Sequence, residues 1–90
     1  MKPPRSNEQW TEDDYETLKL LWETDATLED LCLALGRSAS SVVAQLANKG
    51  YAYFSPKYDA YVRIVPVPIL WTTRELREIN QKVWPEGDSP

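Results

Sequence analysis

The sequence lacks histidine altogether and holds a single cysteine, Cys32. Zinc sites of the ordinary type use several imidazole and thiolate ligands, so this chain has too few of them to assemble one. Serine and cysteine hydrolases need a histidine base, which is also missing. One cysteine cannot form a disulfide within the chain, and Cys32 lies in an apolar stripe typical of a core residue. The composition therefore predicts a protein without metal, cofactor or enzymatic activity.

Long apolar runs are absent too. No segment is long and apolar enough to cross a bilayer, and none resembles a secretory signal, so the sequence predicts a cytoplasmic protein with no membrane partner. Its 90 residues suit one small domain. Apolar residues make up 42% of the chain and aromatic residues 11%, which is enough for a core and excludes wholesale disorder.

The N-terminal half predicts three helices. A capping residue precedes each of three periodic apolar segments: Thr11, Thr27 and Ser38. An aspartate follows both threonines at the third position, as in a capping box, and Trp10 and Tyr15 are spaced as a hydrophobic staple. Gly36 and Gly50 are typical of helix ends. The tight turn at Gly36 makes the second and third helices a helix-turn-helix. The predicted helices span residues 12–24, 28–35 and 39–49.

The apolar pattern changes its period after the third helix. Residues 51–65 alternate and are rich in tyrosine and valine, which predicts a β-hairpin with its turn at Pro56. Two prolines keep residues 66–70 from being a regular inner strand, so we expect an extended crossing segment there.

A fourth helix is predicted over residues 73–84, because Thr72 and Glu75 have the spacing of a capping box. The predicted fold is mostly α with a small β-hairpin. It is a winged helix-turn-helix over residues 10–84, with a three-helix core, a β-hairpin wing and a C-terminal helix. The expected flanking tails are residues 1–9 and 85–90.

Short motifs between Trp10 and Tyr51 resemble a known pattern. They are "WT" before an acidic first helix, "LKLLW" at its end, "LGRS" between the second and third helices, and the spacing of the third helix: Trp10–Thr11, Leu18–Trp22, Leu35–Ser38, Ser41–Val42, Leu46 and Gly50. The pattern is similar to the DNA-binding domain of the GcrA cell-cycle regulator family and, more loosely, to Myb/SANT-type domains. The resemblance implies a helix-turn-helix fold and DNA binding.

The distribution of charge along the chain also favours DNA binding. The net charge is −4, but residues 1–36 carry −6, residues 37–63 carry +3 and residues 64–90 carry −1. The basic segment is the one in which a helix-turn-helix contacts DNA. The resemblance has one departure, because such families usually carry several arginines or lysines on the exposed face of the third helix. This chain has Val43, Gln45, Ala47 and Asn48 there.

The predicted DNA contacts form two sets. Candidates for reading bases lie on the exposed face of the third helix: Ser40, Ser41, Ala44, Gln45 and Asn48. Candidates for phosphate contacts flank it: Arg37, Lys49, Lys57 and Arg63. Four phosphate contacts correspond to a salt slope of about −3.6, which predicts weak binding of double-stranded DNA by a monomer. Useful affinity then requires a homodimer or a second protein on the DNA.

Each candidate also has a structural interpretation that the sequence leaves open. Arg37 could bond the end of the second helix. Gln45, Asn48 and Lys57 could be ordinary solvated surface residues.

The competing hypothesis is a protein-interaction module. Leu20 and Leu33 lie off the apolar stripes of their helices, and Val43 could also be exposed. Either residues 65–71 and the fourth helix cover them, or they form an apolar patch with Trp84 as an anchor. Such an acidic module, encoded by a phage, would bind RNA polymerase or another transcription factor. A bacterial or phage protein of either kind is expected at the nucleoid.

Overall fold

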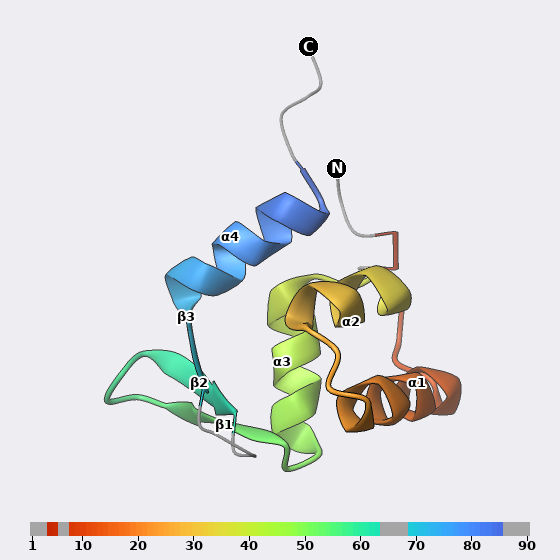
Figure 1. Cartoon of the computed structure of the whole chain (residues 1–90), viewed down its shortest axis with the longest axis horizontal. Coiled ribbons are helices and arrows are strands. Elements are labelled where there is room, and N and C mark those ends of the chain that lie inside the picture. The colour runs from red at the N-terminus through yellow and green to blue at the C-terminus, as the bar shows by residue number, and fades with distance from the viewer. Residues whose placement is uncertain (1–3, 6–7, 64–68, 86–90) are drawn as a thin grey trace.

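The computed structural model describes residues 4–5, 8–63 and 69–85. Within these ranges the chain forms four helices and one small antiparallel sheet. In chain order the elements are α1 (Glu12–Glu23), α2 (Leu28–Leu35), α3 (Ala39–Asn48), β1 (Ala52–Ser55), β2 (Ala60–Arg63), β3 (Ile69–Thr72) and α4 (Thr73–Val83). Helix α3 occupies the centre, with α1 and α2 on one side and α4 and the sheet on the other (Figure 1).

The helix starts follow the capping chemistry read from the sequence. The Thr11 hydroxyl accepts a hydrogen bond from the amide of Asp14, whose carboxylate accepts from the Thr11 amide in return, and Thr27 forms the same reciprocal pair with Asp30. The Trp10 and Tyr15 rings stack with their centroids 5.7 Å apart, as expected for the staple. The predicted bounds of all four helices agree with the structure to within one residue.

Helix α4 begins with half of the predicted capping box. The Thr72 hydroxyl accepts from the Glu75 amide at 3.1 Å. The Glu75 carboxylate lies 3.3 Å from that same hydroxyl, so it accepts from the side chain of Thr72 and not from its backbone amide. The cap still fixes the start of α4 directly after β3.

The sheet is larger than the predicted hairpin. Strands β1 and β2 pair in an antiparallel fashion, as predicted, but β3 pairs with the other side of β2, which makes the strand order β1-β2-β3. The crossing segment predicted for residues 66–70 falls partly outside the described residues, and its last two residues belong to β3. This strand was not predicted because Pro66 and Pro68 directly precede it, and proline cannot donate a hydrogen bond to a strand ladder.

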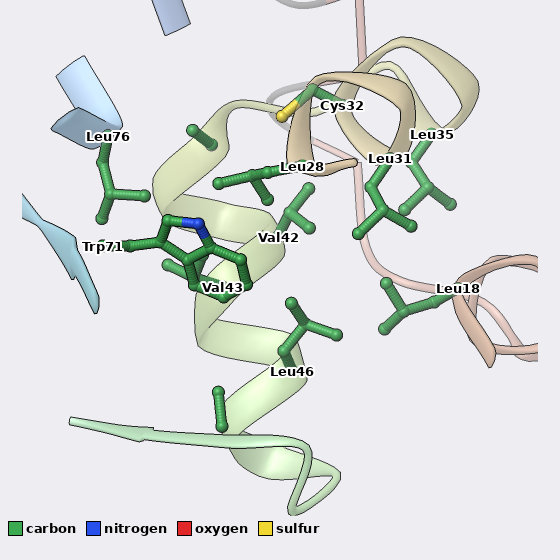
Figure 2. Close-up of a cluster of buried hydrophobic side chains, with 12 residues drawn as sticks. Leu18, Leu28, Leu31, Cys32, Leu35, Val42, Val43, Leu46, Trp71 and Leu76 are labelled. Atoms are coloured by element: carbon green, nitrogen blue, oxygen red, sulfur yellow. The ribbon is translucent and has the colours of Figure 1, made fainter. Parts of the chain in front are cut away.

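The core gathers around α3. Buried side chains from all four helices and from β1 and β3 form one cluster, most of which is labelled in Figure 2: Leu18, Leu28, Leu31, Cys32, Leu35, Ala39, Val42, Val43, Leu46, Ala52, Trp71 and Leu76. Val43 is fully buried, so its expected exposure was wrong. It belongs to the same buried cluster as Trp71 of β3 and Leu76 of α4, two elements whose position the helix pattern alone could not predict.

Part of the predicted N-terminal tail is attached to the domain. The amide of Arg5 donates to the carbonyl of Gly36 at 2.9 Å, and the backbone carbonyls of Arg5, Glu8 and Gln9 bind the side chain of Arg37. These described residues therefore are not a free tail. They carry no periodic signal in the sequence because they are held by hydrogen bonds, not by an apolar stripe.

No helix in the described part of the chain combines the length and apolar content needed to cross a membrane. Within the same residues, no group of three or more metal-ligating side chains comes together.

Candidate nucleic-acid interface

The outward face of α3 carries the residues predicted to read bases. Ser40 and Asn48 are exposed, and Ala44 and Gln45 are half-buried. The side-chain amide of Asn48 donates to Gln45 Oε1 at 3.3 Å, one turn apart on the helix. The structure thus brings four of the five candidates onto one helical surface of small and amide side chains.

Ser41 has a partner within the protein. The indole N–H of Trp10 donates to Ser41 Oγ at 3.3 Å, and Ser41 is half-buried. Its hydroxyl therefore holds the staple at the start of α1 against α3, which leaves it less available to a ligand than Ser40.

Two of the four predicted phosphate ligands are exposed lysines. Lys49 caps the end of α3, and its ammonium group lies 4.1 Å from the centroid of the Tyr15 ring. Lys57 lies in the turn between β1 and β2, and its ammonium group lies 5.3 Å from the Tyr58 ring. Neither lysine forms an ion pair with a described residue. Both charges can therefore face solvent or an anion.

Arg63 is held at the junction of the sheet and α1. Its guanidinium group lies 2.8 Å from a carboxylate oxygen of Asp25 and 4.4 Å from the centroid of the Trp22 ring. Asp25 neutralises much of its charge, which lowers its value as a phosphate ligand.

Arg37 contradicts its predicted role as a phosphate ligand. Its side chain is 2% exposed, and Nη1 and Nη2 donate to the carbonyls of Arg5, Glu8 and Gln9. Nη2 also lies 3.3 Å from Asp14 Oδ2, and the guanidinium group lies 4.8 Å from the Trp10 ring. A phosphate cannot reach this group, so Arg37 is a structural residue. The alternative role expected for Arg37, a structural one, is closer to what is observed. The side chain bonds residues 5, 8, 9 and 14, however, and not the end of the second helix.

Asp14 completes the buried cluster. Arg5 binds both of its carboxylate oxygens, with Nη2 2.9 Å from Oδ2. These hydrogen bonds from Arg5 lower the pKa of Asp14 to about 2, although burial acts in the opposite direction. The acidic start of α1 is therefore more than a helix-dipole device, because one of its three carboxylates fixes two arginines.

The usable positive charge is smaller than the sequence indicates. With Arg37 buried and Arg63 paired, Lys49 and Lys57 remain, which corresponds to a salt slope of about −1.8. Helix α1 also exposes four acidic side chains: Glu12, Asp13, Glu16 and Glu23. Electrostatic attraction to DNA would be weak.

Of the residues predicted for protein contact, Leu20 and Leu33 are exposed and Trp84 is buried. Leu20 and Leu33 are 63% and 59% exposed, so neither α4 nor any other segment that the structure describes covers them. Trp84 contradicts its role as an exposed anchor, because it is 8% exposed and its indole N–H donates to the carbonyl of Arg37 at 2.9 Å. This bond closes the C-terminal end of α4 over the turn between α2 and α3.

The sequence interpretation missed the exposed apolar residues of the sheet. Of the seven exposed large hydrophobic residues described, five belong to the sheet or its turn: Tyr53, Phe54, Tyr58, Ile69 and Leu70. By the strand register, Tyr53 and Leu70 lie on one face of the sheet and Phe54 and Ile69 on the other, so these residues do not form one patch. Alternation marks strands but does not tell which face is inward, so this division could not be predicted without the third strand. A smaller hollow of about 180 Å³ lies between α1 and the end of α3, lined by Tyr15, Glu16, Leu18, Lys19, Lys49 and Tyr51.

No protein-family model, curated protein or solved structure matches this chain. The resemblance to the GcrA and Myb/SANT-type domains therefore stays a prediction.

Proposed function

We propose that the protein is a small DNA-binding transcriptional regulator with a winged helix-turn-helix layout. In this proposal α3 is the recognition helix, the β1–β2 hairpin is the wing and α4 braces the core. The observation that carries the proposal is the outward face of α3. It presents hydrogen-bonding and small side chains without bulky residues, and an exposed lysine stands at its end.

The side chains on this face fit the major groove. Gln45 and Asn48 each offer an amide that can bond both groove-facing atoms of adenine, and a methyl group such as that of Ala44 can contact the methyl of thymine. Ser40 at the first turn of α3 can bond several base edges. The proposed site therefore favours an A·T-containing sequence.

Lys49 and Lys57 are the proposed phosphate ligands, and they replace Arg37 and Arg63 in that role. Two such contacts give little affinity, so a monomer should bind a duplex only at low salt. Specific recognition would require two copies on one DNA or a second protein beside it.

The proposal is tested by fluorescence anisotropy with a labelled random-sequence duplex at a series of salt concentrations. We expect binding at low salt with a slope of about −1.8, and a slope near zero after Lys49→Ala with Lys57→Ala. The matched control is Arg74→Ala with Arg77→Ala, which removes the same charge from exposed positions of α4. No binding at low salt, or an equal loss in the control, would overturn the proposal.

Base reading has a separate test. On an A·T-rich duplex, Gln45→Ala with Asn48→Ala should weaken binding by at least about tenfold without changing the salt slope. A change in slope would mean that these residues act only by holding the helix in place.

A protein-interaction module remains the second candidate function, because five of the seven exposed large hydrophobic residues described belong to the sheet or its turn. In that case the partner would be RNA polymerase or another transcription factor. Binding would survive moderate salt, and it would depend on the sheet and not on the two lysines.

A further inference from the structure

The hollow between α1 and the end of α3 has apolar walls. Leu18 and the rings of Tyr15 and Tyr51 line it, and its volume is about 180 Å³. Leu18 is 1% exposed, so it lies at the base of the hollow and not at its opening. A closed apolar cavity of about 150 Å³ takes up benzene, so this hollow has room for one aromatic ring with a small substituent.

Both aromatic walls are held in place by a second ring. Trp10 stacks on Tyr15, with the ring centroids 5.7 Å apart. Trp22 stacks on Tyr51 in the same way, with a distance of 5.3 Å. The Tyr51 backbone is fixed as well, because its amide donates to the carbonyl of Leu46 at 2.9 Å. The walls are therefore formed before a ligand arrives, which lowers the cost of binding.

The opening of the hollow carries two positive charges and one negative charge. Lys19, Lys49 and Glu16 complete the lining, and all three are exposed. None of them forms an ion pair with another residue that the structure describes. Lys49 already lies over one wall, with Nζ 4.1 Å from the centroid of the Tyr15 ring. With two lysines and one glutamate, the opening has a net charge of +1 on a chain whose net charge is −4.

We propose that this hollow binds a small aromatic carboxylate of about the size of benzoate. The ring packs against the two tyrosine rings and Leu18, and the carboxylate meets the ammonium groups of Lys19 and Lys49. Aromatic walls favour an aromatic ring over an aliphatic chain, because rings gain from stacking on each other. Two unpaired ammonium groups favour an anion over a neutral ligand, and they repel a cation.

The overall acidity of the chain does not oppose an anionic ligand at moderate salt. The Debye length in about 0.1 M salt is about 10 Å, so carboxylates further away than this are largely screened. Charges that touch the ligand are screened much less. The two lysines and one glutamate at the opening therefore decide which sign of charge is bound.

An NMR titration with benzoate tests the site without DNA. The ¹⁵N-labelled protein is titrated at constant ionic strength, and the amides of Tyr15, Lys19, Lys49 and Tyr51 are followed. We expect these amides to shift together and to saturate with a dissociation constant on the order of 1 mM, which suits a ligand of this size. No saturation by about 20 mM, or shifts centred elsewhere on the molecule, would overturn the proposal.

Matched ligands test the chemical class. Benzyl alcohol and benzylamine keep the ring but replace the carboxylate by a neutral or a positive group. Benzyl alcohol should bind about fivefold more weakly than benzoate, and benzylamine more weakly still, because the lysines attract only the anion. Acetate has the charge without the ring and should not saturate. If either benzyl compound binds as tightly as benzoate, or if acetate saturates the same amides, the assignment to an aromatic carboxylate is wrong.

Removing the two lysines tests their role. Lys19→Gln with Lys49→Gln should weaken benzoate binding about fivefold, because both ammonium groups at the opening are lost. The matched control is Arg74→Gln with Arg77→Gln, which makes the same charge change at exposed positions of α4, outside the hollow. The control should bind benzoate like the wild type. An equal loss in both variants would mean that only net charge matters, and the site would be refuted.

Glu16 gives a change of the opposite sign. Glu16→Gln removes the one carboxylate at the opening, so benzoate should bind about twofold more tightly. Glu23→Gln is the matched control, since it removes an exposed carboxylate of α1 that does not line the hollow. The amide spectrum shows whether each variant is folded. Tighter binding in the Glu16 variant alone supports the site, and weaker binding there or equal tightening in the control contradicts it.

Lys49 links this hollow to the proposed DNA surface, and this consequence rests on the proposed function. A bound carboxylate and a DNA phosphate compete for the same ammonium group. Saturating benzoate should therefore raise the dissociation constant for the duplex at least about threefold at low salt, whereas acetate at equal ionic strength should not. An unchanged constant refutes the competition. If the duplex does not bind at all, the proposed function fails, and the titration with benzoate still decides the site.

Discussion

The role of Arg37 in the structure could not be predicted from its position in the sequence. It lies directly after Gly36 in the turn between α2 and α3, where the predicted helix-turn-helix would bring a basic residue to a phosphate. Instead the planar guanidinium group fits into a ring of backbone carbonyls and one carboxylate. A fork of fixed donors can satisfy several acceptors at once, and lysine cannot reproduce it. Arg37 therefore joins the N-terminal segment, α1 and, through its carbonyl, α4.

The first prediction concerns the stability of Arg37 variants. Arg37→Ala should lower the free energy of unfolding by about 3 kcal/mol, because it removes the donor to three backbone carbonyls and one of the two arginines that bind the buried Asp14 carboxylate. Arg37→Lys should lose most of the same energy. Urea denaturation followed by tryptophan fluorescence measures both. Unchanged midpoints, together with a loss of DNA affinity, would restore Arg37 as a phosphate ligand and contradict this assignment.

The second prediction concerns acid stability. The pKa of Asp14 falls from its ordinary 3.8 to about 2 because Arg5 binds its ionised form. A lowered pKa in the folded state gives stability that is present above about pH 4 and is lost as the pH falls towards 2. Asp14→Asn should therefore be less stable at neutral pH and should lose less stability than wild type between these two pH values. Urea melts at several pH values check this, and parallel curves for the two proteins would refute it.

At the scale of elements, Gly36 follows α2 and Gly50 follows α3, but the two glycines have different surroundings. Gly36 and Gly50 both have positive φ, at 66° and 82°. A Cβ at Gly36 would lie 3.2 Å from side-chain atoms of Pro4 and Arg5, whereas a Cβ at Gly50 would meet open space. Residues 4–5 therefore pack directly over the turn between α2 and α3.

The third prediction compares alanine at these two turns. Gly50→Ala should cost about 1 kcal/mol of stability from the left-handed backbone alone. Gly36→Ala should cost more, because the crossing segment must also move. Thermal melts of the two variants give the comparison directly. Equal losses would show that the N-terminal segment does not pack over Gly36 in solution.

The elements differ in how far the sequence could predict them. Helices with both a cap and an apolar stripe, such as α1 and α2, were predictable because local chemistry fixes their bounds. Strand β3 was not, since its pairing with β2 is a long-range contact and prolines precede it. The residues of the candidate site also differ in how far the sequence could predict them. The outward position of Asn48 follows from helical spacing, whereas the burial of Arg37 and Trp84 depends on segments far away in the chain.

At the scale of the whole molecule, buried ion pairs change the charge that a partner meets. The basic middle segment loses Arg37 to the interior and shares Arg63 with Asp25. What remains accessible is the outward face of α3 with Lys49 at its end, Lys57 in the turn between β1 and β2, and an acidic α1. If the protein binds DNA as proposed, it should depend on base contacts and on a second copy or a second protein more than on long-range attraction to DNA.

The fourth prediction locates the DNA surface, which is the central claim. A ¹⁵N-labelled sample is titrated with a short A·T-rich duplex at low salt, and amide shifts are followed by NMR. We expect the largest changes at Ser40, Ala44, Gln45, Asn48 and Lys49, with a smaller change at Lys57 in the wing. Changes centred on Tyr53 and Leu70, or no changes at saturating duplex, would contradict DNA recognition by α3.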